Sequence, residues 1–252
     1  MLADDPQMNV RLPDQVRQPL RVVVDAHYRM PPEAAMLHTP GGAVIVAGAA
    51  LETEEARART EALRRAGARL AFFRPARDRA LPEGTCGLYL GGGYPELHAR
   101  ALSENRSMEE AVRRAVLSGM PTLAECGGFL YLQNTLEDGE GTPWPMAGVL
   151  DGAGFKTPKL QRFGYVTLTA QEDSPYLKQG ETVAAHEFHR WDCSRNGELC
   201  RARRPSGGEG WNCIVGQGNL LAGFPHLYFP SNPQFAARFV AACRQYQERN
   251  AL

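Results

Sequence analysis

A cysteine placed between a predicted strand and two glycines is the residue with the strongest case for chemistry. Residues 122–125 are predicted to form a strand, and Cys126, Gly127 and Gly128 follow directly. Small neighbours would allow the cysteine to stand at a sharp strand-to-helix turn, the arrangement of a nucleophile elbow. The N-terminus of the next helix would favour the attacking thiolate, and the Gly127 amide could face an oxyanion. Alone, the segment fits a structural cysteine in a turn equally well.

A cysteine nucleophile needs a base, and His226 is the best candidate because it lies at the end of an apolar stretch. A lone histidine in that position is more often structural, so its assignment depends on the resemblance described below. His186 and His189 belong to the sequence HEFH, at positions i and i+3. A zinc protease helix requires HExxH, at i and i+4, and the six cysteines form no CxxC pair. No metal site is therefore predicted.

A triple glycine, residues 91–93, follows a predicted strand at residues 87–90. It is not a phosphate-binding loop, because the lysine and the hydroxyl residue of GxxxxGK[ST] are both absent. One interpretation is that the amides of Gly92 or Gly93 approach a reacting carbonyl, since only glycine permits such a close approach. A flexible turn is the alternative.

Short apolar segments alternate with helical patterns, which predicts an α/β fold with a mainly parallel sheet and helices on both faces. The predicted strands are residues 21–25, 43–47, 70–73, 87–90, 122–125, 161–170 and 220–229. Helices are predicted at residues 52–66, 129–135 and 234–248. A further helix is predicted between a capping box at Ser107 and Glu110 and a stop at Gly119 and Pro121.

The overall composition gives no electrostatic signal for nucleic acid or for an anionic membrane, since 28 basic residues balance 28 acidic ones. No apolar run reaches the length of about 18 residues that a membrane span needs. The polar N-terminal segment lacks the apolar core of a signal peptide. A cytoplasmic protein is the expectation.

Four segments together resemble a known family. They are LYLGGGYPELHARALSENRSM from residue 88, SGMPTLAECGGFLYL from residue 118, AAHEFH from residue 184 and HLYFPSNPQFAARFV from residue 226. In this order and spacing they resemble the C-terminal glutaminase domain of cobyrinic acid a,c-diamide synthase, from about residue 72 to the C-terminus. That domain is a class I glutamine amidotransferase with a flavodoxin-like α/β fold.

The resemblance implies roles for several residues. Cys126 would attack the side-chain amide of glutamine, and His226 would relay the proton so that ammonia leaves. Gly92 or Gly93, together with Gly127, would form the oxyanion hole. In the family, ammonia then amidates the a- and c-side-chain carboxylates of cobyrinic acid during cobalamin biosynthesis, after ATP has activated them.

The chain departs from the family pattern near the histidine. Many class I glutaminases carry Glu two residues after the His, where this chain has Tyr228. The cobyrinic acid group also usually lacks that Glu, so a Cys–His dyad is expected, although the group often has His at this position. Pro225 is a second departure. Tyr94 and Glu187 are candidates for contacts with glutamine or with a domain interface, and could equally be structural.

The resemblance implies that ATP and Mg²⁺ bind to a synthetase domain that this sequence does not contain. No cofactor is expected in this chain, and glutamine is its expected substrate. Either the synthetase is a separate chain that acts as a partner in trans and holds the corrinoid acceptor, or this chain is a truncated or rearranged product.

Residues 17–25, 28–34 and 37–47 resemble the middle of the pyrimidine reductase domain of riboflavin biosynthesis. The expected division is a reductase-like fragment at residues 1–70 and an amidotransferase domain at residues 71–252, with a junction near residues 61–70. Alternatively, residues 22–24 and 44–46 supply strands that complete the glutaminase sheet. The alternative functions are a non-catalytic, rearranged α/β module and a reductase fragment.

Overall fold

The computed structural model describes residues 21–24, 44–47, 71 and 73–250, and the chain divides into two compact units, Met1–Arg74 and Pro75–Leu252. In the first unit, β1 (Arg21–Val24) and β2 (Val44–Ala47) pair in parallel. These strands confirm two of the predicted ones. The predicted helix at residues 52–66 and residues 70 and 72 of the predicted strand at 70–73 lie outside the described residues, and the described residues 71 and 73 are not in a strand.

The second unit contains a central four-stranded sheet in the order β13-β14-β4-β3. Its members are β3 (Leu88–Leu90), β4 (Thr122–Glu125), β13 (Val215–Gln217) and β14 (Leu220–Gly223). β3, β4 and β14 run parallel, and β13 is antiparallel to β14. All four residues of β4 are buried, as expected for the middle strand of a covered parallel sheet. The predicted α/β class is confirmed.

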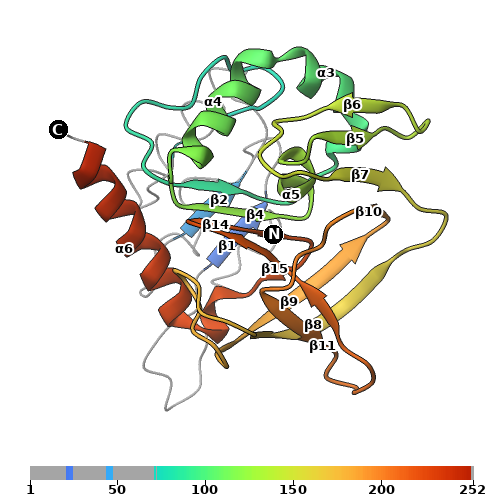
Figure 1. The fold of residues 1–252 in the computed structure, drawn as a ribbon, viewed down its shortest axis with the longest axis vertical. Helices are drawn as coiled ribbons and strands as arrows, with labels where there is room; N and C mark the ends of the chain where they lie inside the picture. Colours follow the sequence, from blue (N-terminus) through green and yellow to red (C-terminus); the bar gives the residue numbers. More distant parts are fainter. Residues whose placement is uncertain (1–20, 25–43, 48–70, 72, 251–252) are drawn as a thin grey trace, which may run out of the picture. The chain divides into compact units, whose positions relative to one another are not determined.

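The helical elements of this unit connect the strands and cover the sheet (Figure 1). They are η1 (Pro95–Leu97), α3 (Ala99–Glu104), α4 (Arg106–Leu117), α5 (Gly127–Tyr131), η2 (Phe229–Ser231) and α6 (Pro233–Asn250). The predicted helix at residues 129–135 is wrong in extent, because Thr135 begins a strand instead.

The predicted capping box of α4 is wrong. The helix begins at Arg106, so Ser107 lies inside it, and the N-cap residue is Asn105, whose side chain does not cap the helix. The amide of Asn105 instead donates to the carbonyls of Pro75 and Asp78 at 2.7 and 2.8 Å. The predicted end is confirmed, since the chain leaves the helix through Gly119 at a φ of +87°.

Two further sheets were not anticipated, because most of their strands are short. The predicted strand at residues 161–170 is confirmed and belongs to the five-stranded one. The predicted strand at residues 220–229 is wrong in extent, since residues 220–223 belong to the central sheet and residues 226–227 to the five-stranded one. One has the order β12-β11-β8-β9-β15 and is antiparallel; the other has the order β10-β7-β5-β6 and is mixed. The members of the first are β8 (Arg162–Ala170), β9 (Thr182–His189), β11 (Cys200–Arg203), β12 (Trp211–Cys213) and β15 (His226–Leu227). The members of the second are β5 (Thr135–Glu137), β6 (Pro143–Pro145), β7 (Ala153–Lys156) and β10 (Trp191–Cys193).

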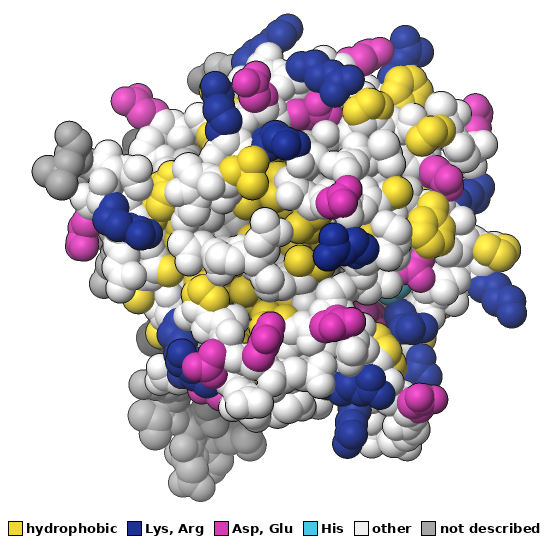
Figure 2. Space-filling model, viewed as in Figure 1, with side chains coloured by type: hydrophobic (Ala, Val, Ile, Leu, Met, Phe, Trp, Pro, Cys, Tyr) yellow, Lys and Arg dark blue, Asp and Glu magenta, His cyan; other side chains and the backbone are white. Residues whose placement is uncertain are grey.

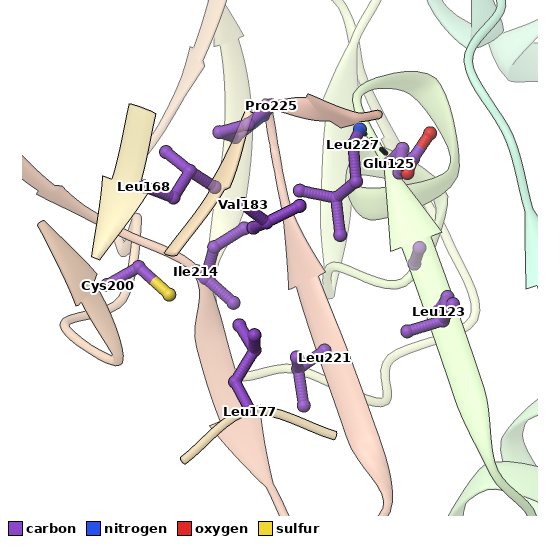
Figure 3. A pocket seen from close by; sticks show the side chains of 11 residues that line it. Leu123, Glu125, Leu168, Leu177, Val183, Cys200, Ile214, Leu221, Pro225 and Leu227 are labelled. Carbon is purple, nitrogen blue, oxygen red and sulfur yellow. Dashed lines mark hydrogen bonds between the residues drawn. The ribbon is translucent and has the colours of Figure 1, made fainter. Parts of the chain in front are cut away.

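The main core lies between the central sheet and the five-stranded sheet. Side chains from both sheets point into this interior in Figure 3, among them Leu123 and Leu221 from the first and Leu168 and Val183 from the second. Each fully buried leucine of this kind stabilises the fold by about 1.5–3 kcal/mol. This core fixes the five-stranded sheet, including β15 and His226, against the carboxyl end of β4.

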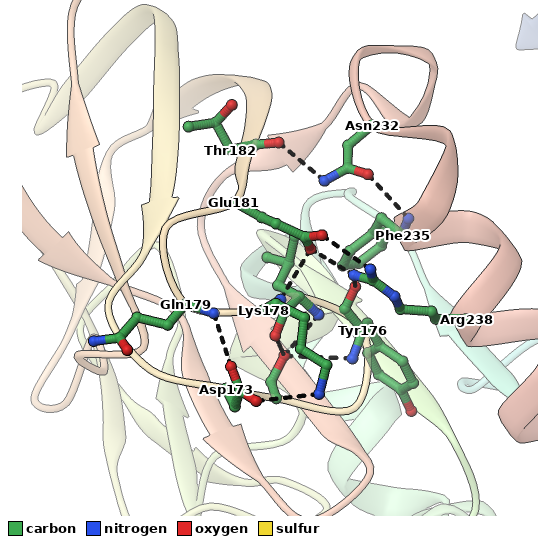
Figure 4. A network of polar contacts seen from close by, with 11 residues as sticks. Asp173, Tyr176, Lys178, Gln179, Glu181, Thr182, Asn232, Phe235 and Arg238 are labelled. Carbon is green, nitrogen blue, oxygen red and sulfur yellow. Dashed lines mark hydrogen bonds and ion pairs between the residues drawn. The ribbon is translucent and has the colours of Figure 1, made fainter.

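Helix α6 is held to the same core by an apolar and an ionic contact. Phe235 is fully buried within it. Arg238 donates to both oxygens of the Glu181 carboxylate, in the turn before β9, with one distance of 2.9 Å (Figure 4). The surface view in Figure 2 shows basic and acidic side chains interspersed over one face. Among the described residues, no helix is long and apolar enough to cross a membrane.

Candidate active site

Cys126 stands at the carboxyl end of β4 in a conformation that few non-glycine residues adopt. Its φ is +49° and its ψ is −104°. Two backbone hydrogen bonds hold it there: its N–H donates to the carbonyl of Gly223 at 2.8 Å, and its carbonyl accepts from Leu130 at 3.0 Å. Backbone strain that the surroundings enforce is common at functional sites, and this strand–turn–helix geometry is that of a nucleophile elbow.

The two glycines after Cys126 are required by close backbone packing. A Cβ atom on Gly128 would lie 2.1 Å from the carbonyl oxygen of Leu90, and one on Gly127 would lie 2.9 Å from the amide nitrogen of Gly93. The Gly128 amide also donates to the carbonyl of Gly91 at 3.1 Å. The glycine loop after β3 therefore packs directly on the elbow.

His226 reaches the same point from β15. Its imidazole interacts with the side chain of Cys126, and this interaction raises the pKa of the ring. A Cβ atom on Gly92 would lie 2.4 Å from the Cε1 atom of His226, whereas one on Gly93 would meet no atom within 4 Å. The structure thus brings together Cys126, His226, Gly92 and Gly127, which the sequence places in three distant segments.

Three backbone amides of the site are candidates for binding a ligand. Within the described residues, the amides of Gly92, Gly93 and Gly127 donate to no backbone carbonyl. Amides that face a substrate carbonyl can stabilise the negative charge that develops on its oxygen.

Glu125 is a residue of the site that the sequence reasoning missed. Its Oε2 atom lies 3.6 Å from the Nδ1 atom of His226. The same oxygen accepts a 2.7 Å hydrogen bond from the phenol of Tyr89, and Oε1 accepts a 3.1 Å bond from the Leu227 amide, drawn as a dashed line in Figure 3. Its position immediately before the cysteine was the available signal, but a strand residue gives no indication of a histidine 101 positions away.

These contacts favour the protonated form of His226. Hydrogen bonds to Cys126 and to Glu125 raise the pKa of the imidazole to about 10, against the opposing effect of its partial burial. Burial and the neighbouring Glu125 carboxylate raise the pKa of Tyr89 well above its usual value, so the phenol remains a hydrogen-bond donor. An imidazolium between a cysteine and a carboxylate is the charge arrangement of a thiolate nucleophile.

The remaining predicted residues lie in different environments. Tyr94 and Tyr228 are 63% and 56% exposed, Tyr94 directly before η1 and Tyr228 directly after β15. Glu187, on β9, is 3% exposed and lines a separate polar cavity. Within the described part of the chain, no group of three or more His, Cys, Asp or Glu residues could hold a metal ion.

Comparison with known proteins gives the family. Residues 58–234 match the CobB/CobQ-like glutamine amidotransferase domain. Cobyrinate a,c-diamide synthase of Caldanaerobacter subterraneus is 42% identical over 188 residues, which cover 74% of this chain and 42% of that protein. The Synechococcus enzyme of the same name is 40% identical over 189 residues, covering 73% of this chain and 40% of that protein.

A third relative, hydrogenobyrinate a,c-diamide synthase of Pseudomonas aeruginosa, is 41% identical over 189 residues, covering 74% of this chain and 41% of that protein. This chain spans about two fifths of the length of these relatives. The matched region contains the whole cluster around the strained cysteine. The chain belongs to the family of CobB/CobQ-like glutamine amidotransferase domains.

Proposed function

We propose that this chain hydrolyses glutamine and that the ammonia serves to amidate the a- and c-side-chain carboxylates of cobyrinic acid or a closely related tetrapyrrole. The observation that carries the proposal is that His226 meets both the side chain of Cys126 and the glycine loop, with the cysteine held at a strained elbow. The names of the relatives supply the acceptor class.

The chemistry follows from these groups. The Cys126 thiolate attacks the side-chain carbonyl carbon of glutamine, and the imidazolium of His226 gives its proton to the departing nitrogen, so that ammonia leaves and a glutamyl thioester forms. His226, now neutral, takes a proton from water, which attacks the thioester carbon. The thiolate then leaves, and glutamate is released.

The oxyanion of each tetrahedral intermediate is assigned to the amides of Gly127 and of Gly92 or Gly93. Gly127 directly follows the nucleophile, and a Cβ atom built on it would lie 2.9 Å from the Gly93 amide nitrogen, so the two segments are in close contact. Two such donors fixed before the reaction lower the barrier without reorganisation, and each contributes about 3–4 kcal/mol in known hydrolases.

Glu125 is assigned as the residue that positions His226. A dyad in which nothing fixes the imidazole would leave its ring free to rotate away from the sulfur. Here the carboxylate lies 3.6 Å from Nδ1 and is itself held by Tyr89 and by the Leu227 amide. Glu125 thus takes the role of the Glu that many class I glutaminases carry two residues after the histidine, where this chain has Tyr228.

The amidation step requires ATP and Mg²⁺, which we assign to a synthetase domain or partner outside this sequence. The support is the length of the relatives, since more than half of each lies outside the matched region. Exposed aromatic residues next to the site fit such a partner: they are Phe163, Tyr165 and Phe188. Tyr165 lies opposite His186, and His186 lies opposite His226, across β8, β9 and β15.

A thiol-directed diazo-ketone analogue of glutamine tests the proposal without requiring a partner. We expect one adduct, on the peptide that contains Cys126, that excess glutamine suppresses and that Cys126→Ala abolishes. The five other cysteines are internal controls. An adduct on another cysteine, or none at all in protein shown to be folded by circular dichroism, would overturn the proposal.

A further inference from the structure

Ile214 is one of two non-glycine residues with a positive φ in the described part of the chain, and the other is Cys126. The φ of Ile214 is +65°. A branched side chain is strongly disfavoured in this left-handed conformation, because its Cβ crowds the neighbouring carbonyl oxygen. The side chain is also buried. The surrounding structure therefore holds Ile214 in a costly conformation, as it does the candidate nucleophile.

The strained residue lies where the chain passes from one sheet to another. β12 ends at Cys213 in the five-stranded sheet, and β13 begins at Val215 in the central sheet, so Ile214 alone makes the turn. A glycine would make this turn without conformational cost. Apart from that of Cys126, every other positive φ among the described residues belongs to a glycine. The turn by itself therefore does not account for an isoleucine, which indicates that its side chain has a further role.

The side chain and the backbone of Ile214 pack against Gly223, the last residue of β14. A Cβ atom on Gly223 would lie 2.8 Å from the Cδ1 atom of Ile214 and 3.2 Å from its Cα atom. On the other side, a Cβ atom on Gly197 would clash with the carbonyl group of Ile214, and that carbonyl accepts a 3.0 Å hydrogen bond from the Leu199 amide. Ile214 is thus clamped between two glycines and fixes the position of Gly223.

Gly223 connects Ile214 to the candidate active site. Its carbonyl accepts the 2.8 Å hydrogen bond from the N–H of Cys126, which is one of the two bonds that hold the elbow. Pro225, directly before His226, lines the same small apolar cavity as Ile214 (Figure 3). The segment that Ile214 supports therefore holds the backbone of the candidate nucleophile at one end and carries the candidate base at the other.

We propose that Ile214 is a positioning residue for Cys126, an assignment that rests on the glutamine hydrolysis proposed above. Its left-handed backbone and its Cδ1 methyl group fix Gly223, and Gly223 fixes the amide of Cys126 relative to His226. A displacement of Gly223 is passed to the cysteine, because one hydrogen bond joins the two backbones directly. Since Ile214 is buried and does not touch the substrate, its substitution should lower kcat and leave KM unchanged.

Gly223→Ala and Ile214→Val test the contact as a pair. The φ of Gly223 is not positive, so the backbone itself accepts alanine. The new Cβ meets the Cδ1 atom of Ile214 at 2.8 Å, and the resulting displacement should lower kcat about 10- to 100-fold. Ile214→Val removes only that Cδ1 atom, so kcat of the double variant should recover about tenfold. A double variant as slow as Gly223→Ala, or a Gly223→Ala protein with the parent kcat, would overturn the proposal.

Ile214→Gly removes the whole side chain and keeps the positive φ without strain. We expect about a tenfold loss in kcat with KM unchanged. Val166→Ala, which truncates another buried side chain of the same core on β8, is the matched control and should keep kcat within about twofold of the parent. Equal losses in the two variants would show a general effect of core packing and would overturn the proposal. If Ile214→Gly does not fold, the paired variants decide.

Hydrogen exchange of the Cys126 amide, followed by nuclear magnetic resonance, gives a readout that needs no turnover. Exchange should be about tenfold faster in Gly223→Ala than in the parent and should slow again when Ile214→Val is added. Exchange that Gly223→Ala leaves unchanged would overturn the proposal even if the protein hydrolyses glutamine. The expected exchange pattern in a protein that releases no glutamate would refute the proposed function and leave the support of the elbow by Ile214 standing.

Discussion

The Nδ1 atom of His226 lies 3.6 Å from the Oε2 atom of Glu125, the residue immediately before the strained cysteine. Two consecutive residues, Glu125 and Cys126, thus provide the carboxylate that faces the candidate base and the candidate nucleophile. The geometry arises because β4 ends at Glu125 and β15 passes over that end, with the Leu227 amide bonded to the same carboxylate at 3.1 Å.

Replacing this carboxylate should lower the basicity of His226. In Glu125→Gln the imidazole keeps its bond to Cys126 but loses the facing charge, so its pKa should fall from about 10 toward the ordinary value. The pKa can be measured from the pH dependence of the His226 Cε1–H resonance. Cys126→Ala should lower it further, because the bond to Cys126 makes the larger contribution. An unchanged titration in Glu125→Gln would contradict the positioning role.

Tyr89→Phe should lower kcat indirectly, because Tyr89 acts on the site through Glu125. The phenol donates a 2.7 Å hydrogen bond to the carboxylate, and its removal should cost about 0.5–1.5 kcal/mol, which is a ~2- to 10-fold loss in kcat for glutamine hydrolysis. In the double variant with Glu125→Gln the two losses should not add, because the tyrosine then has no carboxylate to hold. Additive losses would show that the two residues act independently.

Substitution by alanine should affect kcat very differently at two adjacent glycines. Gly92→Ala places a Cβ 2.4 Å from the Cε1 atom of His226 and must displace the ring, with an expected loss of about 100-fold in kcat. Gly93→Ala meets no atom within 4 Å and should remain within a few-fold of the parent. Both rates come from the same glutamate-release assay. Equal effects would contradict the described position of His226.

The contact between Arg238 and Glu181 should stabilise the fold in a pH-dependent way. The guanidinium lowers the pKa of Glu181 to about 2, chiefly by hydrogen bonding. A depressed carboxylate pKa stabilises the folded state above the unfolded value near 4.5, and this contribution is lost as the pH falls from 4.5 toward 2.

Arg238→Gln should therefore unfold at lower urea than the parent at pH 7, and the difference should narrow below pH 4.5. Arg249→Gln, on the exposed end of the same helix, is the matched control. If the urea midpoints of the parent and Arg238→Gln differ by the same amount from pH 7 to pH 3, the stabilisation by Arg238 is not ionic.

Local patterns were sufficient to predict the elbow. The buried strand before Cys126, the small residues after it and the glycine loop are each encoded within a few positions, and the structure contains all three. The end of α4 was also predicted correctly from Gly119. The helix start was not, because Asn105 uses its side chain to bind the preceding loop, a contact between segments about 30 residues apart.

The parts that were missed gave little local signal. Most strands of the two additional sheets have only two to four residues, which is too short for a clear periodicity. Glu125 was overlooked for the same reason: nothing in its own segment indicates that β15 will bring His226 to it. Glu187 was noticed only through the HEFH sequence, whereas its burial beside His189 follows from the packing of β9.

The most direct measurement is glutamate release from glutamine by the purified chain, alongside Cys126→Ala and His226→Ala. We expect turnover by the parent that is lost in both variants, with circular dichroism confirming that all three proteins are folded. Turnover that persists in Cys126→Ala, or a folded parent that neither releases glutamate nor reacts with the diazo-ketone analogue, would contradict the central claim.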